Sequence, residues 1–241
     1  MFYIKLILCV LWFTITCTIA ALTGLIRWRH PSGGNVFTSL FTVPAARLLG
    51  IEIQVKNFER LDANQPCVYV GNHQSNLDML IQAKCFRPRT VCIGKKEIIW
   101  IPFFGALFFL TGHIFLDRKN HGKAMEGMEQ AKYFLTHRNI SVYMFPEGTR
   151  NKGATKLLPF KKGAFRLAIA AQVPILPIVS CPVKPLIDIE KRKINPGIAH
   201  IEVLEPISTK GLTEADVETL MATTYDRMQK TFEKLSLPNP N

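Results

Sequence analysis

A histidine and an aspartate stand five residues apart in "VYVGNHQSNLDML", residues 68–80. His73 could take a proton from a hydroxyl group if Asp78 accepted a hydrogen bond from its other ring nitrogen and so fixed the tautomer. Positions five apart differ by about 140° around a helix and face opposite sides of a strand, so neither element alone joins the two side chains. They can meet only where His73 lies in the turn before a helix and Asp78 lies in its first turns.

The residues around the pair predict such a junction. "CVYV" is typical of a buried strand, Gly71 and Asn72 form a turn, and "NLDMLIQA" is typical of a helix. The same letters fit a capped helix in which Asn72, Ser75 and Asp78 satisfy backbone amides and His73 lies on the surface. A further alternative is a serine hydrolase with Ser75 as its nucleophile. The local residues leave these interpretations open.

Charged residues follow two later strands. "GHIFLDR" ends with Asp117 and Arg118, where the guanidinium could grip a phosphate or could simply pair with Asp117. In "MFPEGTR", Pro146 and Gly148 bracket Glu147 in a turn and Arg150 follows. We therefore expect a carboxylate and a guanidinium to protrude from this loop, with a rigid turn that binds nothing as the alternative.

Two further blocks complete the pattern. In "LPFKKGAF", Lys161 and Lys162 precede a helix and could add to an anion site. The block "VPILPIV" is uncharged, and we expect it to shape a wall of the site.

The elements that must position these residues alternate between short apolar strands and helical stretches from about residue 51 to the end. This rhythm predicts an α/β domain over residues 51–241, with a mostly parallel sheet flanked by helices and ligands at the carboxyl ends of the strands. A last helix is expected from Thr213, with Asp216 completing its cap.

The front of the chain predicts a membrane-embedded helical segment. The run from Leu6 to Ile26 carries no charge and is about 31 Å long as a helix, which matches the thickness of a bilayer. It passes directly into Arg27 and Arg29 without a small-residue cleavage site, so we expect it to be retained, with the rest of the chain on the cytoplasmic side. Whether it spans the membrane or lies in it stays open.

Residues 1–50 are accordingly expected to form membrane-anchoring helices. The second of these should lie on the membrane and be kinked or split by Pro44. A later apolar run, Ile98 to Gly112, is too short to span, and it could be core or could contact an acyl chain.

The composition limits the partners. Thirty Lys and Arg against 18 Asp and Glu give a formal charge of +12, which favours an anionic partner. The basic residues come in short pairs without interleaved aromatic residues, which argues against nucleic acid. The six cysteines form no C-x-x-C and have no histidine at metal-ligand spacing, so no metal site is expected.

Four blocks in order, "NHQSNLD", "GHIFLDR", "FPEGTR" and "VPILPIV", resemble the glycerolipid acyltransferase family, and most closely its bacterial lysophosphatidate acyltransferases. The resemblance also covers "GKKEIIWIPFFG" and most of residues 67–180. It implies that His73 is a general base oriented by Asp78. It places Arg118, Glu147, Gly148 and Arg150 at positions that bind the phosphate and glycerol of the acceptor.

The resemblance also implies a reaction. A fatty acyl group passes from acyl carrier protein or coenzyme A to the sn-2 hydroxyl of 1-acyl-glycerol 3-phosphate and forms phosphatidic acid, with no cofactor beyond the thioester co-substrate. The expected location is the cytoplasmic (inner) membrane, with the catalytic domain on the cytosolic face. The alternatives are another acceptor, such as glycerol 3-phosphate or a different lysophospholipid, and a non-enzymatic membrane protein that binds anionic lipids.

Overall fold

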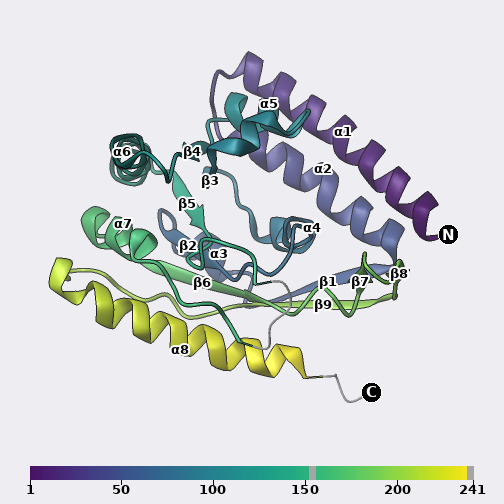
Figure 1. Ribbon diagram of the computed structural model, residues 1–241. Helices are drawn as coiled ribbons and strands as arrows, with labels where there is room; N and C mark the ends of the chain where they lie inside the picture. The colour runs from purple at the N-terminus through teal and green to yellow at the C-terminus, as the bar shows by residue number, and fades with distance from the viewer. Residues whose placement is uncertain (152–155, 238–241) are drawn as a thin grey trace.

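The computed structural model describes residues 1–151 and 156–237 of the chain (Figure 1). Its centre is a seven-stranded sheet in the order β1-β9-β6-β2-β5-β3-β4. The strands are β1 (Ile51–Lys56), β2 (Val68–Gly71), β3 (Thr90–Lys95), β4 (Ile114–Leu116), β5 (Ser141–Met144), β6 (Ile175–Ser180) and β9 (Gly197–Val203). Every neighbouring pair is parallel except β6 with β9, so the prediction of a mostly parallel sheet is confirmed. The small hairpin of β7 (Ile187–Asp188) and β8 (Lys193–Ile194) stands apart and was not predicted.

Helices cover both faces of the sheet. The sheet face that carries Tyr69 and Tyr143 is covered by α2 (Ser32–Leu49), α4 (Asp78–Gln82) and α5 (Phe104–Leu110), and α1 (Phe2–Ile26) packs on α2 and α5 and joins the same apolar core. The opposite face, which carries Val68 and Val142, packs against α6 (His121–His137), α7 (Gly163–Ala171) and α8 (Val217–Ser236). Alternate residues of β2, β3, β5 and β6 thus enter two separate apolar cores, as the pleat of a strand requires.

Short helical turns complete the chain. They are α3 (Arg60–Ala63) and the 3-10 turns η1 (Ala83–Cys85), η2 (Lys96–Trp100) and η3 (Glu214–Asp216). The expected cap at Thr213 is confirmed, because its side chain and that of Asp216 form a reciprocal capping box before α8. Val217, Leu220 and Phe232 are buried on the inner face of that helix.

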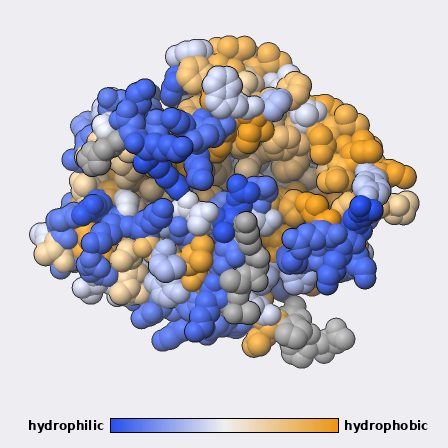
Figure 2. Space-filling model, in the orientation of Figure 1, coloured by the Kyte–Doolittle hydropathy of each residue, from blue (hydrophilic) through white to orange (hydrophobic). Residues whose placement is uncertain are grey.

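The two N-terminal helices lie side by side above the sheet, and the chain changes from helix to strand at Gly50 (Figure 1). Among the helices of residues 1–151 and 156–237, α1 is the one long and apolar enough to cross a membrane. Its outer face exposes a row of aliphatic side chains that includes Ile4, Leu8, Leu11, Ile15, Leu22 and Ile26. Figure 2 shows the corresponding edge of the molecule as a hydrophobic surface.

The helix α2 is sandwiched between α1 and the sheet, with Phe37, Phe41 and Ala45 buried. Of the predicted kink or split at Pro44, the split is wrong, since α2 runs through Pro44 without a break. Proline cannot donate to the carbonyl four residues earlier, which is that of Leu40. The indole N–H of Trp12 in α1 donates to that carbonyl at 3.0 Å, so the neighbouring helix satisfies it.

The apolar run from Ile98 to Gly112 is partly core, and its contact with an acyl chain stays a prediction. Phe104, Leu107 and Phe108 of α5 are buried beneath α1, whereas Trp100 and Phe103 before it are 83% and 52% exposed. By contrast, "VPILPIV" is not a wall of the site. It forms β6, a buried strand between β2 and β9, and it contributes to the site only through Ser180 at its end.

Candidate active site

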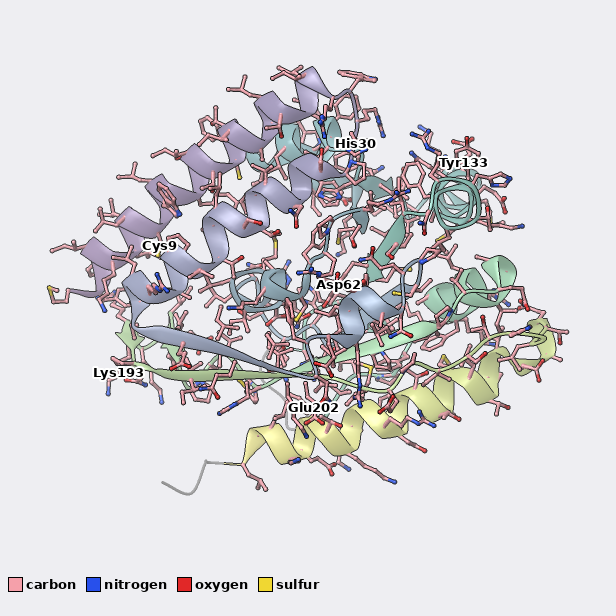
Figure 3. The ribbon with its side chains drawn as sticks, turned by 180° about the vertical axis from the view of Figure 1, so that it is seen from behind. Cys9, His30, Asp62, Tyr133, Lys193 and Glu202 are labelled. Carbon is pink, nitrogen blue, oxygen red and sulfur yellow. The ribbon has the colours of Figure 1, made fainter. Side chains whose placement is uncertain are left out.

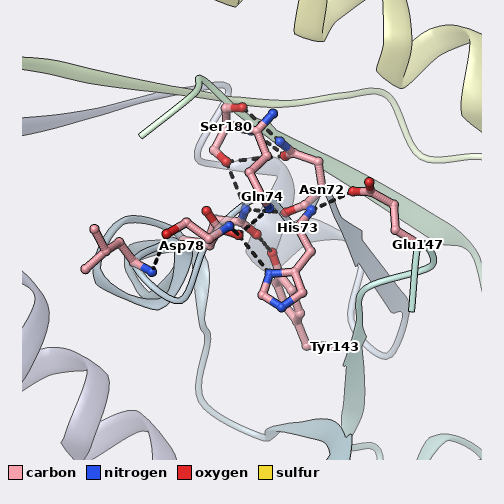
Figure 4. Close-up of polar contacts among 10 residues, drawn as sticks. Asn72, His73, Gln74, Asp78, Tyr143, Glu147 and Ser180 are labelled. Atoms are coloured by element: carbon pink, nitrogen blue, oxygen red, sulfur yellow. Dashed lines mark hydrogen bonds and ion pairs between the residues drawn. The ribbon is translucent and has the colours of Figure 1, made fainter. Parts of the chain in front are cut away.

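His73 and Asp78 meet at the junction between β2 and α4. The ring Nδ1 of His73 lies 2.8 Å from Oδ2 of Asp78, and Asp78 is the first residue of the helix (Figure 4). The same oxygen accepts the backbone N–H groups of Gln74 at 2.6 Å and Ser75 at 2.9 Å. The same oxygen of Asp78 therefore caps the turn and bonds His73, so the capped turn and the histidine–aspartate pair form one structure. An ionised carboxylate can only accept, so Nδ1 carries the proton and Nε2 keeps a lone pair.

The loop after β5 holds the backbone of His73 on both sides. The backbone N–H of His73 donates to Oε1 of Glu147 at 2.7 Å, and the carbonyl of His73 accepts the N–H of Asn151 at 2.8 Å. The ring stacks on Phe145, with centroids 4.2 Å apart. These contacts fix the position of the imidazole as well as its tautomer.

Glu147 does not protrude, contrary to the prediction. Its side chain is 2% exposed, and its second oxygen accepts the N–H of Leu158 at 2.9 Å. Burial raises the pKa of the Glu147 carboxyl, and the two backbone hydrogen bonds oppose that rise. The sequence pattern failed here because a carboxylate in a tight turn can bind backbone amides as readily as a ligand. Glu147 is thus placed to position His73.

A buried polar network lies beneath His73, and the sequence reasoning did not identify it. The Asn72 side chain donates to the carbonyl of Ser180 at 3.0 Å and accepts the Ser180 N–H at 2.8 Å. Gln82 donates to the carbonyl of Asn72 and accepts the Tyr143 hydroxyl at 2.6 Å. A Cβ on Gly71 would lie 2.4 Å from that hydroxyl, so only glycine fits there. The available signal was a polar residue directly after each of two apolar strands.

His73 opens into a cavity of about 310 Å³ between the sheet and the helices α2 and α5. The outer part is polar and basic, with Lys95, Arg118, Thr149 and Arg150 beside His73. The inner part is apolar and aromatic, and its lining includes Phe37, Phe86, Ile98, Phe104, Leu107 and Phe108. The lining therefore suits a ligand with an anionic head and a hydrocarbon body.

Some of the predicted anion-binding residues line this cavity, and others do not. Arg118 and Arg150 line it, and the guanidinium of Arg118 donates to the carbonyl of Gly148, which also lines it. Burial lowers the pKa of Arg118, and the carboxylate of Glu97 opposes that shift. The alternative ion pair of Arg118 with Asp117 is not formed, because Asp117 pairs with Lys96 at 2.7 Å.

The two lysines before α7 are arranged differently. Lys161 is exposed and does not line the cavity, but its side chain crosses Gly148, where a Cβ would lie 2.9 Å from it. Gly148 has φ +68°, a left-handed conformation that also favours glycine. Lys162 turns away to Glu218, at 2.5 Å.

The model of the acyltransferase family matches residues 52–181. The chain belongs to the acyltransferase family. It is 38% identical to the 1-acyl-sn-glycerol-3-phosphate acyltransferase of Haemophilus influenzae over 97% of this chain and 94% of that one. It is 35% identical to the enzyme of the same name from Escherichia coli over 98% of this chain and 95% of the other. The crystal structure of a 1-acyl-sn-glycerophosphate acyltransferase from Thermotoga maritima shares the fold, with a TM-score of 0.75 over the whole of both chains at 24% identity.

Within this acyltransferase fold, the geometry suits general-base chemistry at His73. In the described part of the chain, the hydroxyl of Ser75 accepts the N–H of Leu77 at 3.1 Å and has no hydrogen bond to the His73 ring. A serine nucleophile activated by this histidine is therefore not assembled. Over the same residues, no group of three His, Cys, Asp or Glu side chains could hold a metal ion.

Proposed function

We propose that this acyltransferase transfers a fatty acyl group from an acyl thioester to the sn-2 hydroxyl of 1-acyl-glycerol 3-phosphate and forms phosphatidic acid. One observation carries the proposal: a histidine and aspartate pair stands where a basic cavity mouth meets an apolar interior. The substrates named for its relatives join a phosphate and an acyl chain in one molecule.

The reaction needs one proton acceptor. Nε2 of His73 takes the proton of the sn-2 hydroxyl while its oxygen attacks the thioester carbonyl. The tetrahedral intermediate then collapses, the carbon–sulfur bond breaks, and the thiolate takes the proton back from the imidazolium. The carboxylate of Asp78 stabilises that imidazolium without receiving its proton. A thioester is already activated, so no covalent acyl-enzyme is required.

The cations of the cavity mouth would bind the acceptor. Arg118 and Arg150, which line the cavity, would pair with its phosphate, and the Gly148 backbone would lie close to it. Lys95 is a further cation that lines the mouth and that the sequence reasoning did not single out. Lys161, which crosses Gly148, would add positive potential from the rim.

The donor would be acyl coenzyme A or acyl carrier protein, used as a co-substrate, with no resident cofactor or metal. Both carriers are acidic, and the formal charge of +12 favours their approach. The apolar interior of the cavity, including Phe104 and Phe108, would hold an acyl chain.

We infer that the enzyme is bound to the cytosolic face of a membrane and that α1 lies along the bilayer. Near the start of α1, the guanidinium of Arg192 lies over the ring of Tyr3, 5.7 Å from the ring centroid. Near the end of α1, Gly24 packs on Leu110 of α5. Figure 3 shows Cys9 and Lys193 on the same side of the molecule and His30 at the other end of the helical pair. Because both ends of α1 contact the α/β unit, the helix cannot cross the membrane while that unit stays in water.

The test is an assay of the purified full chain in mixed micelles with labelled acyl thioester and 1-acyl-glycerol 3-phosphate. We expect labelled phosphatidic acid, and its absence with both coenzyme A and carrier-protein donors would overturn the proposal. Glycerol 3-phosphate and other lysophospholipids, supplied in parallel, test the alternative acceptors. Tight binding of the acceptor without any transfer would favour a lipid-binding protein.

A further inference from the structure

A second histidine lines the same cavity and takes no part in the chemistry proposed above. His113 lies just before β4, is 5% exposed, and contacts Phe86 and Phe108, with ring centroids 5.7 and 4.6 Å apart. A row of cavity-lining rings connects it to His73 through Phe145, Tyr143 and Phe86. Successive centroids in this row lie between 4.2 and 6.4 Å apart. His113 therefore belongs to the inner, aromatic part of the cavity.

The tautomer of His113 follows from its surroundings. Its Nδ1 lies 3.1 Å from the backbone N–H of Cys92, which can only donate. Burial lowers the pKa of His113 to about 3, so the ring is neutral near pH 7. With Nδ1 accepting in a neutral ring, the proton must be on Nε2. His113 thus presents an N–H group at its far edge.

This N–H has no protein acceptor within the described residues, where the Cys92 bond is the ring's only hydrogen bond. Gly34 of α2 lies against the same edge, and a Cβ there would lie 2.9 Å from Nε2. Glycine therefore lets α2 approach the ring closely at this point, and both Gly34 and His113 line the cavity. A buried donor without an acceptor destabilises its surroundings, and a saturated hydrocarbon chain offers it none.

We propose that His113 is a specificity-determining residue that favours acyl chains carrying a hydrogen-bond acceptor at its depth in the cavity. The acceptor is an oxygen, as in an oxo or hydroxy chain. The inference rests on the proposed function, because the cavity must hold an acyl chain. The His113 N–H would let the enzyme discriminate between acyl chains of equal length, which an entirely apolar cavity would not do.

The experiment offers the full-length enzyme two acyl coenzyme A donors of equal chain length in competition and measures the product ratio by mass spectrometry. One donor is saturated, and the other carries a single oxo group, placed at successive positions along the chain in separate experiments. The expected wild-type result is a preference of about fivefold for the oxo chain at one position, which is the gain from one neutral hydrogen bond.

Three variants test whether His113 causes this preference. His113→Leu removes the donor at similar volume and should bring the ratio close to one, whereas His113→Gln retains an N–H donor and should keep part of the preference. The matched control Met79→Leu changes another cavity-lining residue without changing polarity and should leave the ratio as in the wild type. If His113→Leu does not fold, the wild-type position scan and His113→Gln still decide.

A wild-type ratio near one at every position, or an unchanged preference in His113→Leu, overturns the role of His113. Transfer of both chains without discrimination would leave the proposed function intact. Absence of any transfer by the wild type would instead count against the proposed function.

Discussion

Two histidines line one cavity, and the group bonded to Nδ1 gives them opposite properties. At the mouth, Nδ1 of His73 donates to the carboxylate of Asp78, so Nε2 has a lone pair and can act as a base. In the interior, Nδ1 of His113 accepts from the backbone of Cys92, so Nε2 carries a proton and can act only as a donor. The comparison shows that the role of a histidine is set by its neighbour rather than by its presence in a pocket.

The surroundings of the two histidines differ as well: those of His73 are polar and those of His113 are aromatic. Around His73, the side chains of Asp78 and Glu147 and the backbone of Asn151 supply polar partners, and the ring edge reaches solvent. Around His113, the neighbours are the rings of Phe86 and Phe108. The first region gives its histidine a carboxylate partner and access to solvent, and the second surrounds its histidine with apolar rings.

The largest expected effect is that of His73→Ala. Loss of the general base should lower kcat by about 10³- to 10⁴-fold, whereas His113→Leu should retain measurable transfer of saturated chains. Phosphatidic acid formation in mixed micelles measures both. If the two variants were equally inactive while folded, the distinction between base and donor would be wrong.

Asp78→Asn should lower kcat by about 10²- to 10³-fold. The amide can present its NH₂ group to Nδ1 and so stabilise the tautomer that places the proton on Nε2, which would make His73 resemble His113. The pH profile of kcat and the transfer rate are the measurements. Near wild-type activity would show that Asp78 serves only as a helix cap.

Glu147→Gln should lower kcat by about tenfold and destabilise the loop by about 1–3 kcal/mol. The amide can accept from only one of the two N–H groups, those of His73 and Leu158, that the carboxylate now satisfies. A larger change in KM for the acceptor than in kcat would instead favour direct substrate binding by Glu147. Steady-state kinetics and thermal unfolding separate these outcomes.

His113 should also make the free energy of unfolding depend on pH. The pKa of His113 is lowered by burial to about 3, whereas its ordinary value is 6.5. Between these values the unfolded chain binds more protons, so the free energy of unfolding falls as the pH is lowered. In His113→Leu this slope should weaken by up to about 1.4 kcal/mol per pH unit between pH 6.5 and 3. Urea unfolding in detergent at several pH values measures the slope, and equal slopes would place His113 in contact with water.

Ser75→Ala should have the smallest effect, within about threefold on kcat. Its hydroxyl bonds the N–H of Leu77 and not His73, so only a local turn contact is lost. A burst of acyl-enzyme in the wild type that vanished in this variant would restore the serine hydrolase alternative.

Local chemistry made the mouth of the cavity largely predictable. The strand, the turn and the start of the helix around His73 follow from short-range propensities, and the parallel sheet follows from the alternation of elements. Glu147 was misjudged because its partners, His73 and Leu158, depend on which loops meet in space. His113 was not identified at all. Its tautomer depends on Cys92, which is distant in the chain and adjacent only in the folded sheet.

The loop after β5 has a consequence for motion. It bonds the backbone of His73 through Glu147 and Asn151, and it bonds the side chain of Arg118 through Gly148. His73 and Arg118, the proposed proton acceptor and the proposed phosphate-binding cation, are thereby tied to the same short segment. They should shift as one rigid body, so a perturbation of this segment would misalign the hydroxyl and the phosphate of the acceptor together.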